Sequence, residues 1–223
     1  SRGNRSATFE KRSFALKLSE GIEMLGLPKN KKWKLNAEHI DKTFMRNKLS
    51  YDLFKSFSPE NWAPDVEFCV VYINKKYQGI YAMTQSVDAS TLNLSKGSDG
   101  GILFKEPPVS YPPEEHADRF EKFKKYVQRS SRYKDYSIKA RYKLEDECYF
   151  NQRHPDIKKI DCSDEIYRLT EFIFNSSDTE FSNPSVFNTY FDLDNLIDWH
   201  LLILVTANGD GTYKNYYMSR KEE

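Results

Sequence analysis

Two runs of β-branched and aromatic residues, 66–73 and 77–84, flank the short polar sequence Asn74-Lys75-Lys76. Runs of this length and composition predict strands, and a short polar turn between them predicts an antiparallel hairpin. This hairpin predicts an antiparallel sheet in the N-terminal part of the chain. Other strands and helices of this region have to be arranged around it.

Upstream, residues 13–18 alternate apolar Phe14 and Leu16 with polar or small neighbours, which predicts a half-buried strand. Residues 21–33 hold Gly26, Pro28 and a lysine-rich bend, and we expect them to form a turn-rich connection whose lysines are solvated. A helix is predicted from Asp41, with Asp41 or Thr43 as its cap. Its apolar positions fall on one face at Met45, Leu49, Leu53 and Phe54.

Downstream of the hairpin, a short strand is predicted at 100–104, followed by an exposed proline-rich loop at 106–115. Helical spacing of apolar residues predicts helices at 116–129, 164–174 and 192–207, whereas 130–164 gives no assignment. The helix at 192–207 has the clearest pattern, with a candidate cap at Asp192 or Asp194 and Gly209 just past its end. His200 lies on its apolar face and is expected to be a core histidine. A last strand is predicted at 214–219.

This order of elements predicts an α+β protein with two lobes. Strand, helix and hairpin precede a boundary near 85–93, and mostly helices follow it. We therefore expect an N-terminal lobe of sheet plus helix at 1–88 and a mostly helical C-terminal lobe at 89–223.

Composition argues against several classes of protein. With 34 Lys and Arg against 33 Asp and Glu, the net charge of +1 lacks the basic excess typical of nucleic-acid-binding proteins. No apolar run approaches the roughly 20 residues of a membrane span. Cys69, Cys148 and Cys162 lack zinc-ligand spacing. A Cys148–Cys162 disulfide is one alternative in an extracellular protein, and buried free thiols are the favoured one.

The segment after the clearest helix carries the candidate chemistry. Asp210 and Asn215 have the Asp-x-x-x-x-Asn spacing of the protein-kinase catalytic loop. There the Asp orients the attacking hydroxyl and the Asn holds a metal ion against the ATP phosphates. Asp-Gly turns are common, so the spacing gains weight from its context. The elements predicted before this segment follow the order of those in a protein kinase: a strand with Lys17, a helix, a hairpin, a linker and further helices. The alternative interpretation of Lys17 is a lysine on a solvated strand face.

Four stretches of the sequence resemble the CotH kinase family of spore-coat proteins. They follow the family's order and span nearly the whole chain, although 106–190 contributes little. They are Arg2-Gly3-Asn4 with residues 11–18 (KRSFALKL); Leu25-Gly26-Leu27-Pro28 through Lys32-Trp33, with residues 41–49 (DKTFMRNKL); Val71-Tyr72-Ile73-Asn74 with residues 77–81 (YQGIY); and Asn208-Gly209-Asp210 with Lys214-Asn215-Tyr216-Tyr217.

The resemblance implies an atypical, bilobal, protein-kinase-like fold and transfer of the ATP γ-phosphoryl group to Ser or Thr hydroxyls of a protein substrate, with Mg or Mn. Asp210 is then the catalytic residue, Asn215 a metal ligand and Lys17 a phosphate contact. Residues 83–87 are the hinge beside the adenine, with Met83 and Gln85 as nucleotide contacts. The phosphate-covering turn is identified with Arg2, Gly3 and Asn4. A secreted, cell-surface or spore-coat location is implied as well.

Two departures from the family pattern support an alternative. The family's second metal-binding Asp follows the last strand, and no such motif occurs before Glu223. The predicted helix after Asp41 contains no Glu to pair with a lysine. We therefore expect the chain to be incomplete at both ends, and inactivity of the 223 residues alone is an alternative to kinase activity, because the second metal-binding Asp would lie beyond Glu223. A pseudokinase or surface-associated binding module is the second hypothesis.

Overall fold

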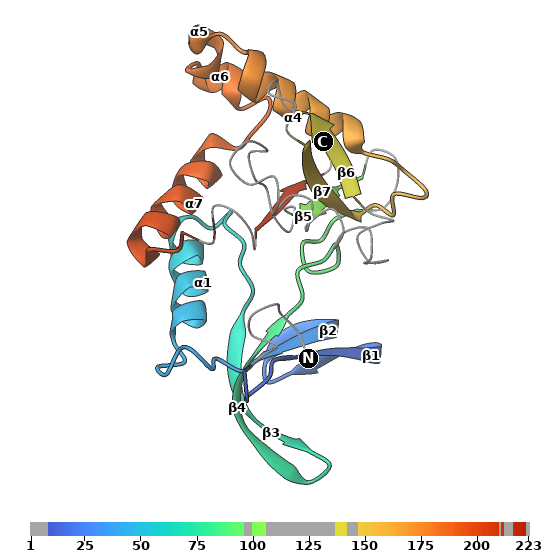
Figure 1. Ribbon diagram of the computed structural model, residues 1–223, viewed down its shortest axis with the longest axis vertical. Helices are drawn as coiled ribbons and strands as arrows, with labels where there is room; N and C mark the ends of the chain where they lie inside the picture. Colours follow the sequence, from blue (N-terminus) through green and yellow to red (C-terminus); the bar gives the residue numbers. More distant parts are fainter. Residues whose placement is uncertain are drawn as a thin grey trace. The chain divides into compact units, whose positions relative to one another are not determined.

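The computed structural model describes residues 9–95, 100–105, 137–141, 147–209, 211 and 216–221. The chain divides into two compact units, Ser1–Leu92 (unit 1) and Asn93–Glu223 (unit 2). Each unit contains a four-stranded antiparallel sheet and at least one helix (Figure 1). The α+β prediction is confirmed. The described part of unit 2 contains a four-stranded sheet beside its helices, which the expectation of a mostly helical C-terminal part did not include.

The sheet of unit 1 has the strand order β1-β2-β4-β3. Its strands are β1 (Phe14–Met24), β2 (Leu27–Asn36), β3 (Val66–Ile73) and β4 (Lys76–Gln85). The predicted hairpin is confirmed as β3 and β4. Its turn consists of Asn74 and Lys75, whose φ angles of 50° and 64° are those of a type I′ turn. One face of the sheet forms the core of unit 1, made of Leu27, Trp33, Leu35, Ala37, Tyr81 and Met83.

The prediction that 21–33 is a connection is wrong. β1 continues to Met24 and β2 begins at Leu27, so the two strands form a second hairpin around Leu25 and Gly26. Both turn residues have positive φ, 56° and 77°. The register of β1 is irregular between Lys17 and Met24, and such bulges break the two-residue period by which a strand is recognised. The lysines of β2 are therefore strand residues, of which Lys29, Lys31 and Lys32 are exposed.

Helix α1 (Arg46–Phe57) begins later than the predicted start at Asp41. The N-cap position is Met45, without a side-chain cap hydrogen bond, so the predicted cap at Asp41 or Thr43 is wrong. Asp41 still binds the start of the helix, because its carboxylate accepts hydrogen bonds from the Thr43 hydroxyl (2.6 Å) and the Arg46 backbone N–H (2.8 Å). The hydrogen bond from Thr43 is the main cause that lowers the pKa of Asp41. Lys55 pairs with Asp65 at 2.6 Å and ties α1 to the segment before β3.

The sheet of unit 2 has the order β6-β7-β5-β8. Its strands are β5 (Ile102–Lys105), β6 (Ser137–Arg141), β7 (Glu147–His154) and β8 (Tyr217–Arg220). The strand predicted at 100–104 is confirmed with shifted ends, and the one at 214–219 is confirmed for its C-terminal part. β6 and β7 come from the stretch that gave no assignment. The predicted loop at 106–115 and helix at 116–129 lie outside the described residues.

A buried glutamine joins the sheet of unit 2 to the chain that follows β7. The Gln152 amide donates to the carbonyl groups of Pro155 and Ile160, each at 2.8 Å, and accepts from the Cys162 N–H at 3.0 Å. Cys162 in turn packs with Ile166 and with β5. Cys69 and Cys162 are free thiols, so the Cys148–Cys162 disulfide is not formed. The prediction of a buried free thiol is confirmed at Cys162.

Four helices follow: α4 (Ser163–Asn175), α5 (Asp178–Phe181), α6 (Pro184–Phe187) and α7 (Leu193–Thr206). α4 and α7 confirm the helices predicted at 164–174 and 192–207. An aromatic cluster holds α4, α5 and α6 together, centred on Phe172, which stacks on Tyr190 with ring centroids 4.0 Å apart. None of the helices in the described ranges combines the length and the apolar character that a membrane crossing requires.

Helix α7 differs from its prediction at the C-terminal end and on its apolar face. Asp192 is the cap, accepting from the Asn195 N–H at 2.9 Å, as predicted. Ala207, not Gly209, takes the left-handed position after the helix. His200 is exposed, so its interpretation as a core residue is wrong; Ile203 is buried instead. All residues from Leu201 to Val205 are apolar, and spacing alone therefore does not identify the buried side.

Ala207→Gly is expected to raise the free energy of unfolding by about 0.5–1 kcal/mol. Ala207 has a φ of 50°, where its Cβ is crowded and glycine is not. Ala89→Gly is the matched control, because Ala89 is not among the positive-φ residues. Urea denaturation followed by circular dichroism should show Ala89→Gly to be neutral or destabilising. A destabilised Ala207→Gly protein would contradict the left-handed ending of α7.

Candidate functional site

Lys17 lies on the outer face of the sheet of unit 1. In the β1–β2 register it is directly opposite Lys32, and directly opposed residues of antiparallel strands project from the same face. The neighbouring residues Phe14 and Leu16 pack against the core on the other face. Lys17 is exposed, and the part of the chain that the structure describes supplies no ion-pair partner for it. Its ammonium group is therefore available to an anion.

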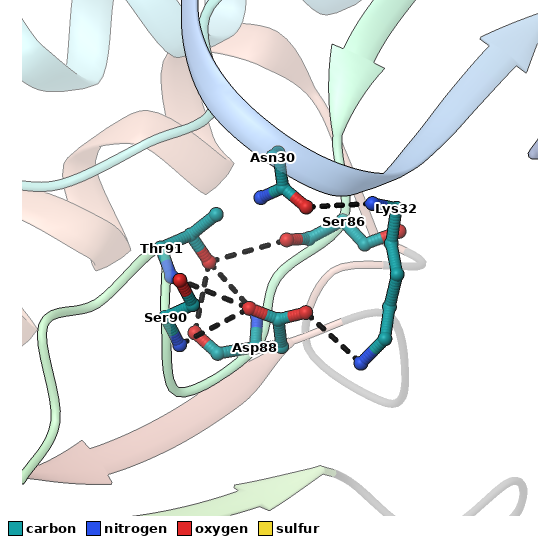
Figure 2. Close-up of polar contacts among 6 residues, drawn as sticks. All are labelled: Asn30, Lys32, Ser86, Asp88, Ser90 and Thr91. Atoms are coloured by element: carbon teal, nitrogen blue, oxygen red, sulfur yellow. Dashed lines mark hydrogen bonds and ion pairs between the residues drawn. The ribbon is translucent and has the colours of Figure 1, made fainter. Parts of the chain in front are cut away.

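The second lysine is held by the turn after β4 (Figure 2). Lys32 pairs with the Asp88 carboxylate at 3.1 Å, and its carbonyl group accepts from the Ser86 N–H at 3.0 Å. Asp88 also accepts from the N–H groups of Ser90 (3.1 Å) and Thr91 (3.3 Å). The Thr91 hydroxyl accepts from the Asp88 N–H at 2.9 Å. This turn fixes the chain as it leaves β4 and neutralises Lys32, which leaves Lys17 as the uncompensated cation of the pair.

Met83 and Gln85 lie on the other face of the sheet. Met83 is opposite Leu35 and Gln85 is opposite Trp33, and all four are buried on the core side. The structure therefore does not bring their side chains together with Lys17. A ligand at this strand end would meet backbone groups rather than the Met83 side chain.

Several buried polar atoms near this strand end have no hydrogen-bond partner. They are Asn30 Nδ2, Thr84 Oγ1 and Gln85 Oε1. An unpaired buried donor or acceptor costs roughly 1–3 kcal/mol, so such groups are uncommon and require a reason. Thr84 and Gln85 belong to the end of β4, within the segment 83–87 predicted to lie beside a nucleotide base, whereas Asn30 belongs to β2. Sequence reasoning named only Gln85 among the three.

Asp210 and Asn215 lie outside the described residues, as do Arg2, Gly3 and Asn4. The chain on both sides of Asp210 is described. After α7, the Asn208 N–H donates to the Ile203 carbonyl group at 3.0 Å, and the Gly211 N–H donates to the Asn208 carbonyl group at 2.9 Å. A Cβ at Gly211 would lie 2.4 Å from Ile203 Cδ1. A larger residue after Asp210 would therefore require the side chains of Ile203 and Asn208 to move.

A pocket of about 250 Å³ with both apolar and charged residues in its lining lies in unit 1, where sequence reasoning predicted no site. Its lining includes Lys11, Glu38 and Asn47. The Lys11 ammonium group donates to the carbonyl groups of Ala37 (2.8 Å) and Ile80. Burial lowers the pKa of Lys11 and raises the pKa of Glu38, whose carboxylate accepts from the Asn47 amide at 2.8 Å. Lys11 belongs to residues 11–18, one of the stretches that resemble the CotH kinase family, and this resemblance was the sequence signal that could have pointed to the pocket.

No group of three or more His, Cys, Asp or Glu side chains suited to a metal occurs among the residues with described positions. Asp210 and Asn215 are not among those residues. Carboxylate and amide oxygens of this kind suit Mg or Mn, so the expected donor set is chemically appropriate.

Comparison with known proteins gives two findings. The family model described as CotH kinase protein matches residues 1–223. The inner spore coat protein H of Bacillus subtilis (strain 168) is 26% identical over 223 residues, which is 100% of this chain and 53% of that protein. The chain thus spans about half the length of this curated relative.

Proposed function

The chain belongs to the CotH kinase protein family, and from this we propose that it is an atypical protein kinase that transfers the γ-phosphoryl group of ATP to Ser or Thr hydroxyls of a protein. The observation that carries the proposal is the family match over all 223 residues, which includes Lys17, Asp210 and Asn215. The relative is a spore-coat protein, and we extend a spore-coat location to this chain as part of the proposal.

The proposed mechanism assigns one task to each residue. Asp210 accepts the hydrogen bond of the substrate hydroxyl and orients it toward the γ-phosphorus. Lys17, an exposed cation on β1, neutralises charge on the phosphates. Asn215 would supply an oxygen ligand to Mg or Mn, and the bound metal would stabilise the charge that develops on the phosphate oxygens. Phosphoryl transfer depends mostly on such positioning and charge neutralisation.

The alternative is a pseudokinase or surface-associated binding module. It is supported by the separation of the Met83 and Gln85 side chains from Lys17, on opposite faces of the sheet. The two functions differ in their products. A kinase converts ATP to ADP and leaves phosphate on a protein acceptor, whereas a binding module returns ATP unchanged. Incubation with ATP, Mg or Mn, and dephosphorylated casein as a generic acceptor distinguishes them.

Lys17→Ala is expected to weaken ATP binding about 10- to 100-fold, because a hydrogen bond to a charged group contributes about 1.5–3 kcal/mol. Lys29→Ala is the control, since Lys29 is an exposed lysine of the same sheet with no proposed role. Isothermal titration with ATP and Mg measures both variants. Equal affinities for wild type and Lys17→Ala would remove Lys17 from the nucleotide site.

A further inference from the structure

One face of the β3–β4 hairpin is apolar and exposed. Successive strand residues alternate sides, and Cys69 and Val71 pack toward the core of unit 1. The residues on the opposite side remain open to solvent: Phe68, Val70, Tyr72, Tyr77 and Ile80, with Val70 54% and Tyr72 64% exposed. β4 pairs with β2 only over Ala82–Gln85, so the hairpin extends past β2, as Figure 1 shows. Contiguous apolar surfaces of this kind mark interaction sites.

The hairpin also ends the sheet. β3 is an edge strand. Within the described ranges, the backbone along its outer side has a side-chain partner at its start, where Lys48 donates to the Val66 carbonyl group at 3.2 Å, and no other is seen. Among the described residues no strand pairs with that side from Glu67 to Ile73. The other edge, β1, is protected by register irregularities and by charged residues such as Glu20 and Glu23. β3 is therefore the edge that can accept another strand.

The charges along β3 indicate which strand fits. Its first end carries Asp65 and Glu67, and the turn at its other end carries Lys75 and Lys76. An antiparallel copy of β3 reverses this order, so acidic residues of one chain face basic residues of the other. A twofold axis then produces the same contact twice. A parallel copy would place like charges together.

We propose that two copies of this chain associate through antiparallel pairing of β3, joining their four-stranded sheets into one continuous sheet. Centred on Val70, the pairing places Val70 beside the partner's Val70 and Phe68 beside the partner's Tyr72. Because these residues share one face of β3, this register makes the exposed apolar side continuous across the dimer and covers the backbone groups of the edge.

The test is the molar mass of the 223-residue chain, measured by sedimentation equilibrium from low micromolar to about 500 μM. Wild type is expected to change from monomer to dimer over this range. Val70→Lys, which places two ammonium groups at the twofold axis, is expected to raise the dimer dissociation constant more than tenfold. Ile22→Lys, an equivalent change on the other edge strand, is expected to leave it within about twofold. Circular dichroism checks that both variants are folded.

Exchanging the charges of two facing residues gives a second, independent test of the dimer. With Val70 at the centre, Lys75 of one chain is opposite Asp65 of the other. Asp65→Lys or Lys75→Glu alone is expected to weaken the dimer about three- to tenfold, since each places like charges together twice, and the double variant is expected to recover wild-type affinity. A wild-type monomer at every concentration overturns the proposal. So does a dimer that Val70→Lys leaves intact, or a double variant no better than either single one.

Discussion

Asp210→Ala is expected to lower the rate of phosphoryl transfer by about 100-fold or more, because positioned base residues contribute on this order to the rate. The loss should appear in kcat with the KM for ATP nearly unchanged, since the proposed role of Asp210 is to orient the protein hydroxyl. Transfer of labelled γ-phosphate to casein measures the effect. Asp194→Ala is the control, as Asp194 is an exposed acidic residue in the first turn of α7. An Asp210→Ala protein with the wild-type rate would remove Asp210 from catalysis.

Trp33→Ala is expected to cost about 3–5 kcal/mol of stability in unit 1, a large part of what a domain possesses. Trp33 is completely buried at 0% exposure, and its indole N–H donates to the Asn30 carbonyl group at 3.0 Å. The substitution removes this bond and leaves a cavity in the core of unit 1. Urea denaturation followed by far-ultraviolet circular dichroism measures the change.

The control for this variant is Trp62→Ala. Trp62 is 38% exposed and lies outside the core cluster of unit 1, so its loss is expected to cost about 1 kcal/mol or less. Comparable losses for the two tryptophans would show that Trp33 is not at the centre of the folded unit.

Local signals made some elements predictable. The β3–β4 hairpin combines strand-forming runs with a two-residue turn, and the start of α7 is set by the capping side chain of Asp192. Both depend on residues that are close in the sequence. The β1–β2 hairpin was missed because bulges interrupt the alternation of β1 and because the lysines of β2 look like a solvated turn.

The sheet of unit 2 could not be predicted from local signals for a different reason. β5 pairs with β7 and β8, which follow it at long sequence distances. Its buried anchor, Gln152, is polar and becomes a core residue only because Pro155, Ile160 and Cys162 satisfy its amide. No pattern of apolar residues reveals such a position.

The candidate site was predictable in part. Motif spacing and resemblance selected Lys17, Asp210 and Asn215, and the structure places Lys17 on an exposed sheet face beside Lys32. The same reasoning could not separate the two faces of the sheet at Met83 and Gln85, because the register between β2 and β4 determines which side each residue takes. It also missed the Lys11–Glu38 pocket, which forms between segments that are apart in the sequence.

Phosphosite mapping by mass spectrometry tests the central proposal most directly. The protein is incubated with ATP, Mg or Mn, and dephosphorylated casein, and ADP is measured in the same samples. The proposed function predicts phosphate on Ser or Thr residues, with an equal amount of ADP formed, and neither product without the metal. ATP that is bound with either metal but returned without ADP or phosphoprotein would contradict kinase activity and favour the binding module.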